Sequence, residues 1–509
     1  MKWRTLLLLS ASGMAASSVL VWTAIEPARG SRAAAPSVSA PAPARKVASA
    51  PDRSQFQAGR TLRMEGRLGH GVLPAATDSQ TYLFADVSAA AGQRAATPAP
   101  LNLTIVMDRS GSMKGKRLTN AVAAARSALQ RLRDGDVVSI VAYNTAADVV
   151  LAPTVVDASS RPLLSGRLDR LRAAGDTCIS CGIDTGMRLL NQRSAMVSRI
   201  LLLSDGEATA GVRDQRGFRS LAEDCRRMGA SITTIGVDVD YNERIMAALA
   251  RDSNGRHFFV QDPSGLPVIF DQEMESLAST VANGAELAID LAPGVFAEQV
   301  YDRSSVTSGS QVVVPLGAFA AGDRKTVLLR LRVPRGRAGQ RPVAAVRLRY
   351  QDLAEGKPGN LEGNLAARLT DDPSEVGPLD GLVSARVSSS ETAAALEEAN
   401  DLFRSGRGAE ARKLVKDKAG VLAGRRVDAR SATPTKRATE LDASFERQEA
   451  ALSDAESGFA QPPAPNSAAA GAADPAAAGA AGDEGSAGPA RDQKARVRSN
   501  QKEAFDLGE

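Results

Sequence analysis

The sequence predicts an α/β protein in which a doubly wound, mainly parallel sheet is inserted in or flanked by a β-sandwich, with a helical segment behind it. First, short apolar runs alternate with segments of helical periodicity between residues 101 and 281, as in sheets covered on both faces. Second, strand-like alternation of apolar and polar residues flanks this region on both sides. Third, the Ala- and Pro-rich ends cannot bury a core, so disordered ends are expected.

The α/β region contains six apolar runs of strand character, of which the third is expected to pair as an antiparallel edge. These runs lie at 101–107, 137–143, 147–151, 200–203, 231–237 and 257–260. Helical spacing of apolar residues fills the intervals. The expected helices lie at 118–132, 163–171, 183–196, 218–228, 243–250 and 267–281.

The flanking strands are expected to form one domain. Runs at 62–68 and 81–87 are too few for a stable sheet alone, so they should join the strands between 286 and 350 in one sandwich. The α/β domain would then be an insertion. The predicted boundaries are strands of the sandwich at 56–98, the α/β domain at 99–283, the rest of the sandwich at 284–370, a helical segment at 371–459 and a mostly disordered tail at 460–509.

The N-terminus has the pattern of an export segment. Lys2 and Arg4 precede a mostly apolar stretch, so residues 1–25 are predicted to be a signal peptide or an uncleaved signal anchor. An Ala/Pro/Ser-rich spacer follows at 26–55. We therefore expect a protein outside the cytoplasmic membrane, in the periplasm, on the cell surface or secreted, with an N-terminal membrane anchor as one option.

Composition argues against several functions. The net charge is +5 with both signs interspersed and no basic run, which gives nucleic-acid binding little support. Two histidines and three cysteines leave little material for a zinc site. No nucleophile elbow of the Gly-x-Ser-x-Gly type occurs, and neither histidine lies in the context of a catalytic base. These observations favour a protein that is not an enzyme.

Oxygen-bearing side chains follow the apolar runs of the α/β region. Asp108, Asp205 and Asp238 each come directly after a predicted strand, and Ser110 and Ser112 lie on the loop behind Asp108. In a parallel sheet these groups emerge at the same end, where ligands bind in open α/β folds. A blander interpretation is that the two serines only cap the following helix.

Asp108-Arg-Ser-Gly-Ser112 resembles the metal-ion-dependent adhesion site of the von Willebrand factor type A (VWA) family, which has a Rossmann-like sheet. Two later segments, around Thr177 and Asp205, resemble the second and third loops of that site. The resemblance implies a divalent ion held by Asp108, Ser110, Ser112, Thr177 and Asp205. Mg²⁺ is expected, with Mn²⁺ or Ca²⁺ as substitutes. Asp238 matches no ligand of the family and is expected at the rim of the site or as a loop former.

Cys178 and Cys181 form a Cys-x-x-Cys beside Thr177, and two interpretations stay open. The pair is either redox-active or a local disulfide that stiffens the metal loop in an oxidising compartment. The disulfide is favoured. Cys225, at a helical position, is expected to be packed.

The resemblance implies a binding function. We expect a metal-dependent adhesion module that captures a protein partner through an Asp or Glu carboxylate on the ion. The alternatives are a non-adhesive scaffold or assembly factor of a cell-envelope complex and a metal- or thiol-dependent enzyme. The flanking sandwich is similar in layout to bacterial exported VWA proteins and to inter-alpha-trypsin inhibitor heavy chains. The oligomeric state is left open.

Overall fold

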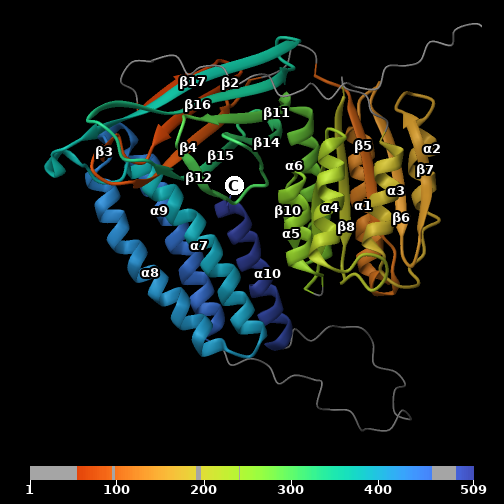
Figure 1. Cartoon of the computed structure of the whole chain (residues 1–509). Helices are drawn as coiled ribbons and strands as arrows, with labels where there is room; N and C mark the ends of the chain where they lie inside the picture. Colours follow the sequence, from red (N-terminus) through yellow and green to blue (C-terminus); the bar gives the residue numbers. More distant parts are fainter. Residues whose placement is uncertain (1–53, 94–97, 191–195, 240, 461–488, 509) are drawn as a thin grey trace, which may run out of the picture. The chain divides into compact units, whose positions relative to one another are not determined.

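A six-stranded sheet forms the centre of the α/β domain in the computed structural model, which describes residues 54–93, 98–190, 196–239, 241–460 and 489–508 (Figure 1). All strands are parallel except β7, which pairs antiparallel with β6, as predicted for that edge. In spatial order the strands are β10 (His257–Val260), β9 (Ala230–Val237), β8 (Val197–Ser204), β5 (Leu101–Asp108), β6 (Val137–Tyr143) and β7 (Ala147–Val155).

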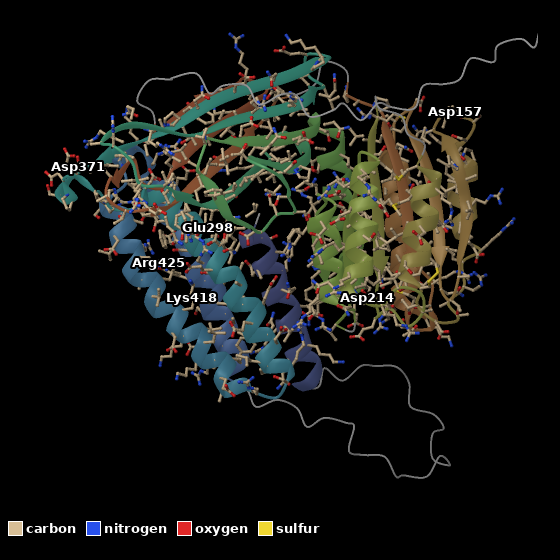
Figure 2. The ribbon with its side chains drawn as sticks, viewed as in Figure 1. Asp157, Asp214, Glu298, Asp371, Lys418 and Arg425 are labelled. Atoms are coloured by element: carbon tan, nitrogen blue, oxygen red, sulfur yellow. A yellow bond between two sulfur atoms is a disulfide. The ribbon has the colours of Figure 1, made fainter. Side chains whose placement is uncertain are left out.

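Helices cover both faces of this sheet, which confirms the doubly wound fold. One face packs on α1 (Lys116–Arg131), α2 (Arg161–Leu168) and α6 (Leu266–Ala278), and the other on α3 (Ile179–Leu189), α4 (Gln215–Arg227) and α5 (Glu243–Asp252). Neighbouring strand residues point to opposite faces. Accordingly, Ile105 lies in the first core and Val106 in the second. Asp214 caps α4 by accepting a hydrogen bond from Gly217 N at 3.0 Å (Figure 2).

The remaining strands form two sheets with a shared core. The five-stranded sheet has the order β1 (Gln55–Ala58), β2 (Leu62–Leu68), β4 (Ser79–Ala89), β15 (Arg324–Val333) and β12 (Phe296–Tyr301). The six-stranded sheet has the order β13 (Val306–Ser308), β14 (Gln311–Ala320), β11 (Thr280–Leu291), β16 (Gly339–Asp352), β17 (Lys357–Thr370) and β3 (Val72–Pro74).

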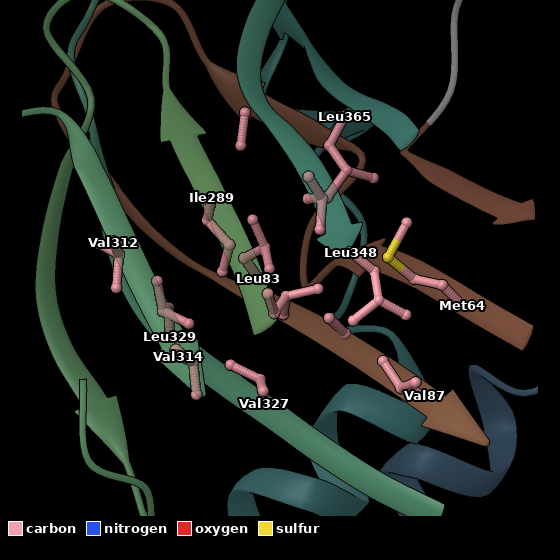
Figure 3. Packing of buried hydrophobic residues seen from close by; sticks show 14 of the residues in the cluster. Met64, Leu83, Val87, Ile289, Val312, Val314, Val327, Leu329, Leu348 and Leu365 are labelled. Atoms are coloured by element: carbon pink, nitrogen blue, oxygen red, sulfur yellow. The ribbon is translucent and has the colours of Figure 1, made fainter. Parts of the chain in front are cut away.

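Strands from before and after the α/β domain pair with each other in both sheets. β4 runs antiparallel to β15 and β3 runs parallel to β17. The α/β domain is therefore inserted in the sandwich, as the sequence predicts. Leu83 of β4, Val314 of β14 and Leu348 of β16 meet in the fully buried core (Figure 3). Burial of such aliphatic side chains contributes about 1.5–3 kcal/mol each.

The outer face of the five-stranded sheet is covered by the helical segment. Phe84 and Leu328 of that sheet pack against Val383 and Val387 of α7 (Gly381–Arg404). Two further helices, α8 (Gly408–Ser431) and α9 (Ala438–Phe459), pack with α7 around a common core. Short 3₁₀ turns η1 to η4 lie at Gly111–Met113, Pro263–Gly265, Pro373–Glu375 and Thr435–Arg437.

The chain end departs from the prediction of a mostly disordered tail at 460–509. Residues Pro489–Gly508 form a helix, α10, that packs against α7, α9 and α5. Val497 and Phe505 are buried on it, and so are the polar Arg498 and Gln501. The apolar stripe of α10 is therefore short, and much of its buried face is polar. From composition alone, such polar residues are expected to be exposed to solvent.

No helix within the described ranges is long and apolar enough to span a bilayer. The predicted signal segment at 1–25 and nearly all of the predicted spacer at 26–55 lie outside the described residues.

Candidate metal site

Asp108 is the innermost residue of the site. It ends β5, the fully buried strand of the sheet centre, and its side chain has no exposure to solvent. Its Oδ1 accepts from Ser110 N at 2.8 Å, and its Oδ2 accepts from Ser204 Oγ at 2.9 Å and from Tyr143 OH at 3.3 Å. Burial raises the pKa of Asp108, while these hydrogen bonds oppose the rise. The carboxyl group is thus fixed in orientation.

The two serines and Asp205 extend this centre. Ser110 Oγ and Ser112 Oγ lie 3.0 Å apart, and Ser112 Oγ donates to Asp205 Oδ1 at 2.7 Å. Asp205, which follows β8, is fully buried, and burial together with the negative charge of Asp108 raises its pKa to about 6. Neither serine side chain caps the short turn η1 or helix α1, so the cap-only interpretation fails here.

Thr177 reaches the same place from another loop. Its backbone N donates to Thr209 Oγ1 at 2.9 Å, and Thr209 N donates back to Thr177 O at 3.0 Å. A Cβ atom on Gly206 would lie 3.7 Å from Ser112 Oγ and 3.8 Å from Thr177 Oγ1. The two hydroxyls therefore converge above one point of the backbone.

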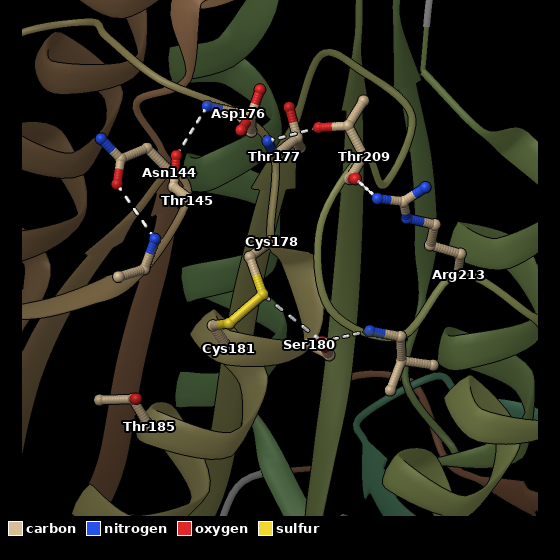
Figure 4. The surroundings of a disulfide bond; sticks show 12 residues. Asn144, Thr145, Asp176, Thr177, Cys178, Ser180, Cys181, Thr185, Thr209 and Arg213 are labelled. Carbon is tan, nitrogen blue, oxygen red and sulfur yellow. Dashed lines mark hydrogen bonds between the residues drawn. A yellow bond between two sulfur atoms is a disulfide. The ribbon is translucent and has the colours of Figure 1, made fainter.

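The Cys178–Cys181 pair forms a disulfide directly behind Thr177 (Figure 4). Cys178 is buried, and its backbone N donates to Asn144 O at 2.7 Å, which ties this loop to the end of β6. The favoured interpretation of the Cys-x-x-Cys as a local staple is confirmed. Cys225 is a buried free thiol, as predicted, and burial raises its pKa to about 12, which favours the protonated thiol.

Arg117, in the first turn of α1, was not predicted as part of the site. Its Nη1 donates to Asp205 Oδ2 at 3.2 Å and to Ser112 O at 2.8 Å. Its Nε donates to Asp238 Oδ2 at 2.9 Å, and its Nη2 also pairs with that carboxylate. Asp238 is therefore a partner of this arginine at the rim. The position of Arg117, about one helical turn after Ser112, could have indicated that it lies near the site. Its pairing with Asp238 could not be predicted from the sequence.

The donor set fits a hard divalent cation. Among the described residues no group of three or more His, Cys, Asp or Glu side chains could hold a metal. The site instead combines the carboxylates of Asp108 and Asp205 with three hydroxyls, of which Ser112 and Thr177 converge over Gly206 and Ser110 lies 3.0 Å from Ser112. Oxygen donors with two negative charges neutralise a divalent ion and are the ligands that Mg²⁺ prefers.

Comparisons with known proteins agree with this architecture. A model of the von Willebrand factor type A domain matches residues 102–272. An uncharacterised protein of Synechocystis is 26% identical over 52% of this chain and 65% of its own length. Inter-alpha-trypsin inhibitor heavy chain H1 of Sus scrofa is 24% identical over 42% of this chain and 24% of its own length. The chain thus spans less than two thirds of these curated relatives.

A solved structure extends the likeness beyond the α/β domain. The structure titled von Willebrand factor type A from Catenulispora acidiphila has a TM-score of 0.61 and 19% identity, and it covers 72% of this chain and 88% of its own. Because that coverage exceeds the α/β domain alone, the fold is shared by parts of the flanking domains as well.

Proposed function

Because residues 102–272 form a VWA domain, a fold that commonly mediates protein–protein interaction, we propose that this chain is a divalent-metal-dependent protein-binding module that acts outside the cytoplasmic membrane. The observation that carries the proposal is the direct contact of Ser112 with both Ser110 and Asp205, next to Asp108 and Thr177. Three loops far apart in the sequence thereby bring five oxygen-bearing side chains together.

The proposed metal is Mg²⁺, with Mn²⁺ or Ca²⁺ as substitutes. Asp108, Ser110, Ser112 and Thr177 would hold it directly or through water, and Asp205 through water. When bound, the ion supplies a Lewis-acidic position for one carboxylate oxygen of an Asp or Glu on a protein partner. The role of the chain is to orient these ligands through Ser204, Tyr143 and the Cys178–Cys181 staple. We propose binding without catalysis.

Two features support export. Structural disulfides persist in oxidising compartments and are rare in the cytosol, and the Cys178–Cys181 bond stands beside the proposed site. The apolar segment near the N-terminus, with Lys2 and Arg4 ahead of it, is the second feature.

The test is metal binding by matched variants. We expect Asp205→Asn to weaken binding of Mn²⁺ about 10- to 100-fold in isothermal titration calorimetry of the full chain, the range for loss of a group that orients or holds a metal. Asp169→Asn is the control, since its carboxylate is exposed on α2's C-terminal side and pairs with Arg126. Equal Mn²⁺ affinity of wild type and Asp205→Asn would remove this site from the proposal.

A second measurement separates adhesion from scaffolding. Protein captured from envelope extract in Mg²⁺ should elute with a chelator and should be lost with Asp205→Asn. Capture that survives both treatments supports a metal-independent scaffold instead.

A further inference from the structure

The guanidinium of Arg117 contacts two carboxylates, that of the proposed metal ligand Asp205 and that of Asp238, which follows β9. One nitrogen donates to Asp205, while Nε and Nη2 face Asp238. Asp238 has φ +63°, a left-handed conformation that aspartate adopts more readily than most residues other than glycine, and two hydrogen bonds hold it there. Its backbone N donates to Val260 O at 2.8 Å, and its Oδ1 accepts from Val239 N at 2.7 Å.

Tyr241 connects this strand end to the C-terminal helix. A Cβ on Gly236 of β9 would lie 2.3 Å from the Tyr241 ring, so the ring fills the space above that residue, two positions before Asp238. Arg498 of α10 donates to Tyr241 O at 3.0 Å, and its guanidinium carbon lies 5.6 Å from the centre of the ring. The helix thus holds Tyr241 by its backbone and by its ring.

A buried ion-pair network reinforces the same contact. Glu243, at the start of α5, lies 3.0 Å from Arg498 Nη1 and also pairs with Arg404 of α7. Glu243 is 4% exposed and Arg498 is 8% exposed. Arg498 depends on Glu243 to compensate its buried charge, whereas Glu243 would keep Arg404 as a partner if Arg498 were removed.

We propose that the Arg117–Asp238 pair is a positioning contact that couples occupancy of the metal site to the docking of the C-terminal helix α10. The proposal rests on the metal-dependent function proposed above. When α10 is docked, Tyr241 keeps the end of β9 in place and Asp238 draws most of the Arg117 guanidinium away from Asp205. When α10 is released, Asp238 loses this support, and the positive charge of Arg117 turns towards Asp205 and competes with the cation.

The expected sign distinguishes this mechanism from simple electrostatics. Loss of the positive charge of Arg498 would, by Coulomb's law alone, strengthen the binding of a cation slightly. Coupling through Asp238 and Arg117 predicts the opposite, namely weaker binding. Linkage is reciprocal, so bound metal must also stabilise the docked helix.

The test uses the full chain with Mn²⁺ alone as the probe. Arg498→Met removes the charge and the hydrogen bonds of the docking contact. Arg496→Met is the matched control on the same helix, because Arg496 contacts Ser457 O of α9 and is only partly buried. We expect the Mn²⁺ dissociation constant to rise about fivefold in Arg498→Met, at the low end of allosteric couplings, and to stay unchanged in Arg496→Met.

Two further arms complete the test. In an Arg117→Gln background, Arg498→Met should leave Mn²⁺ affinity unchanged, because the competing guanidinium is gone. Hydrogen exchange at residues 492–508 of the wild type should slow when Mn²⁺ is added. Wild type that binds no Mn²⁺ overturns the proposed function and the coupling together. Wild type that binds Mn²⁺ while Arg498→Met has the same affinity, or a higher one, overturns the coupling alone.

Discussion

His257 makes the stability of this protein depend on pH in a calculable way. It opens β10, is 1% exposed, and accepts or donates hydrogen bonds with Thr234 Oγ1 at 2.9 Å and Tyr241 OH at 3.4 Å. The Phe505 ring of α10 packs edge-on against it. Burial, followed by the positive charges of Lys502 and Arg251, lowers its pKa from 6.5 to about 3.

The sign follows from the two pKa values. As the pH falls through 6.5 the unfolded chain takes up a proton on His257, whereas the folded chain does so only near pH 3. The contribution to stability is therefore complete above pH 6.5 and is lost below it, at up to about 1.4 kcal/mol per pH unit. Between about pH 6.5 and 4.5 this amounts to roughly 2–3 kcal/mol of unfolding free energy.

The measurement compares wild type with His257→Gln in urea titrations followed by circular dichroism. Glutamine stays neutral, so the variant is expected to be less stable at pH 7 but to lose less stability on acidification. His70→Gln is the comparison at the chain's other histidine, which is half-buried and whose pKa is also lowered by burial. Parallel pH curves for wild type and His257→Gln would refute the reasoning, because the difference between them isolates this one group.

Two glycine substitutions and one double cysteine replacement have further expected outcomes. Gly182→Ala on α3 should destabilise the chain by about 1–3 kcal/mol, because a Cβ there would lie 2.7 Å from Tyr143 Cδ1 and 2.8 Å from Val106 Cγ1. Gly166→Ala on α2 is the comparison, because a Cβ there would meet no atom within 4 Å. This variant should be more stable than wild type by up to about 1 kcal/mol in thermal unfolding. Replacing Cys178 and Cys181 together by serine should lower the free energy of unfolding by about 1–3 kcal/mol and weaken Mn²⁺ binding. Unchanged Mn²⁺ affinity would show that Thr177 is positioned without the disulfide.

The parts of the candidate site that directly follow a strand could be located from the sequence. Asp108 and Asp205 each end an apolar run, and in a parallel sheet that alone places both carboxylates at one end of the sheet. The structure adds the contact of Asp205 with Ser112, at 2.7 Å, which this placement allows. Arg117 was missed because its partner Asp238 lies 121 residues away, and nothing in either segment specifies the other.

Helix α10 was missed for a different physical reason. It follows a segment whose composition predicts disorder, and few of its residues are apolar, so helical periodicity is weak. Its docking depends on polar groups that find partners only in the folded chain: Asn500 donates to Asn400 Oδ1 at 3.2 Å, and Gln501 donates to Glu397 Oε1 at 3.1 Å. Hydrogen bonds of this kind between distant segments leave no periodic trace in a sequence.

Helix α10 covers one edge of the central sheet. β10 is an edge strand of that sheet, and α10 contacts both β10 and the neighbouring α5. Its Arg498 lies at the carboxyl end of β9, through Tyr241, and its Phe505 lies at the amino end of β10, through His257. The helix therefore runs from the end of the sheet that carries the proposed metal ligands towards the opposite end. Because α6 also passes directly into β11 of the sandwich, the α/β domain is joined to the rest of the chain both through α6 and through the contacts of α10 with α7 and α9.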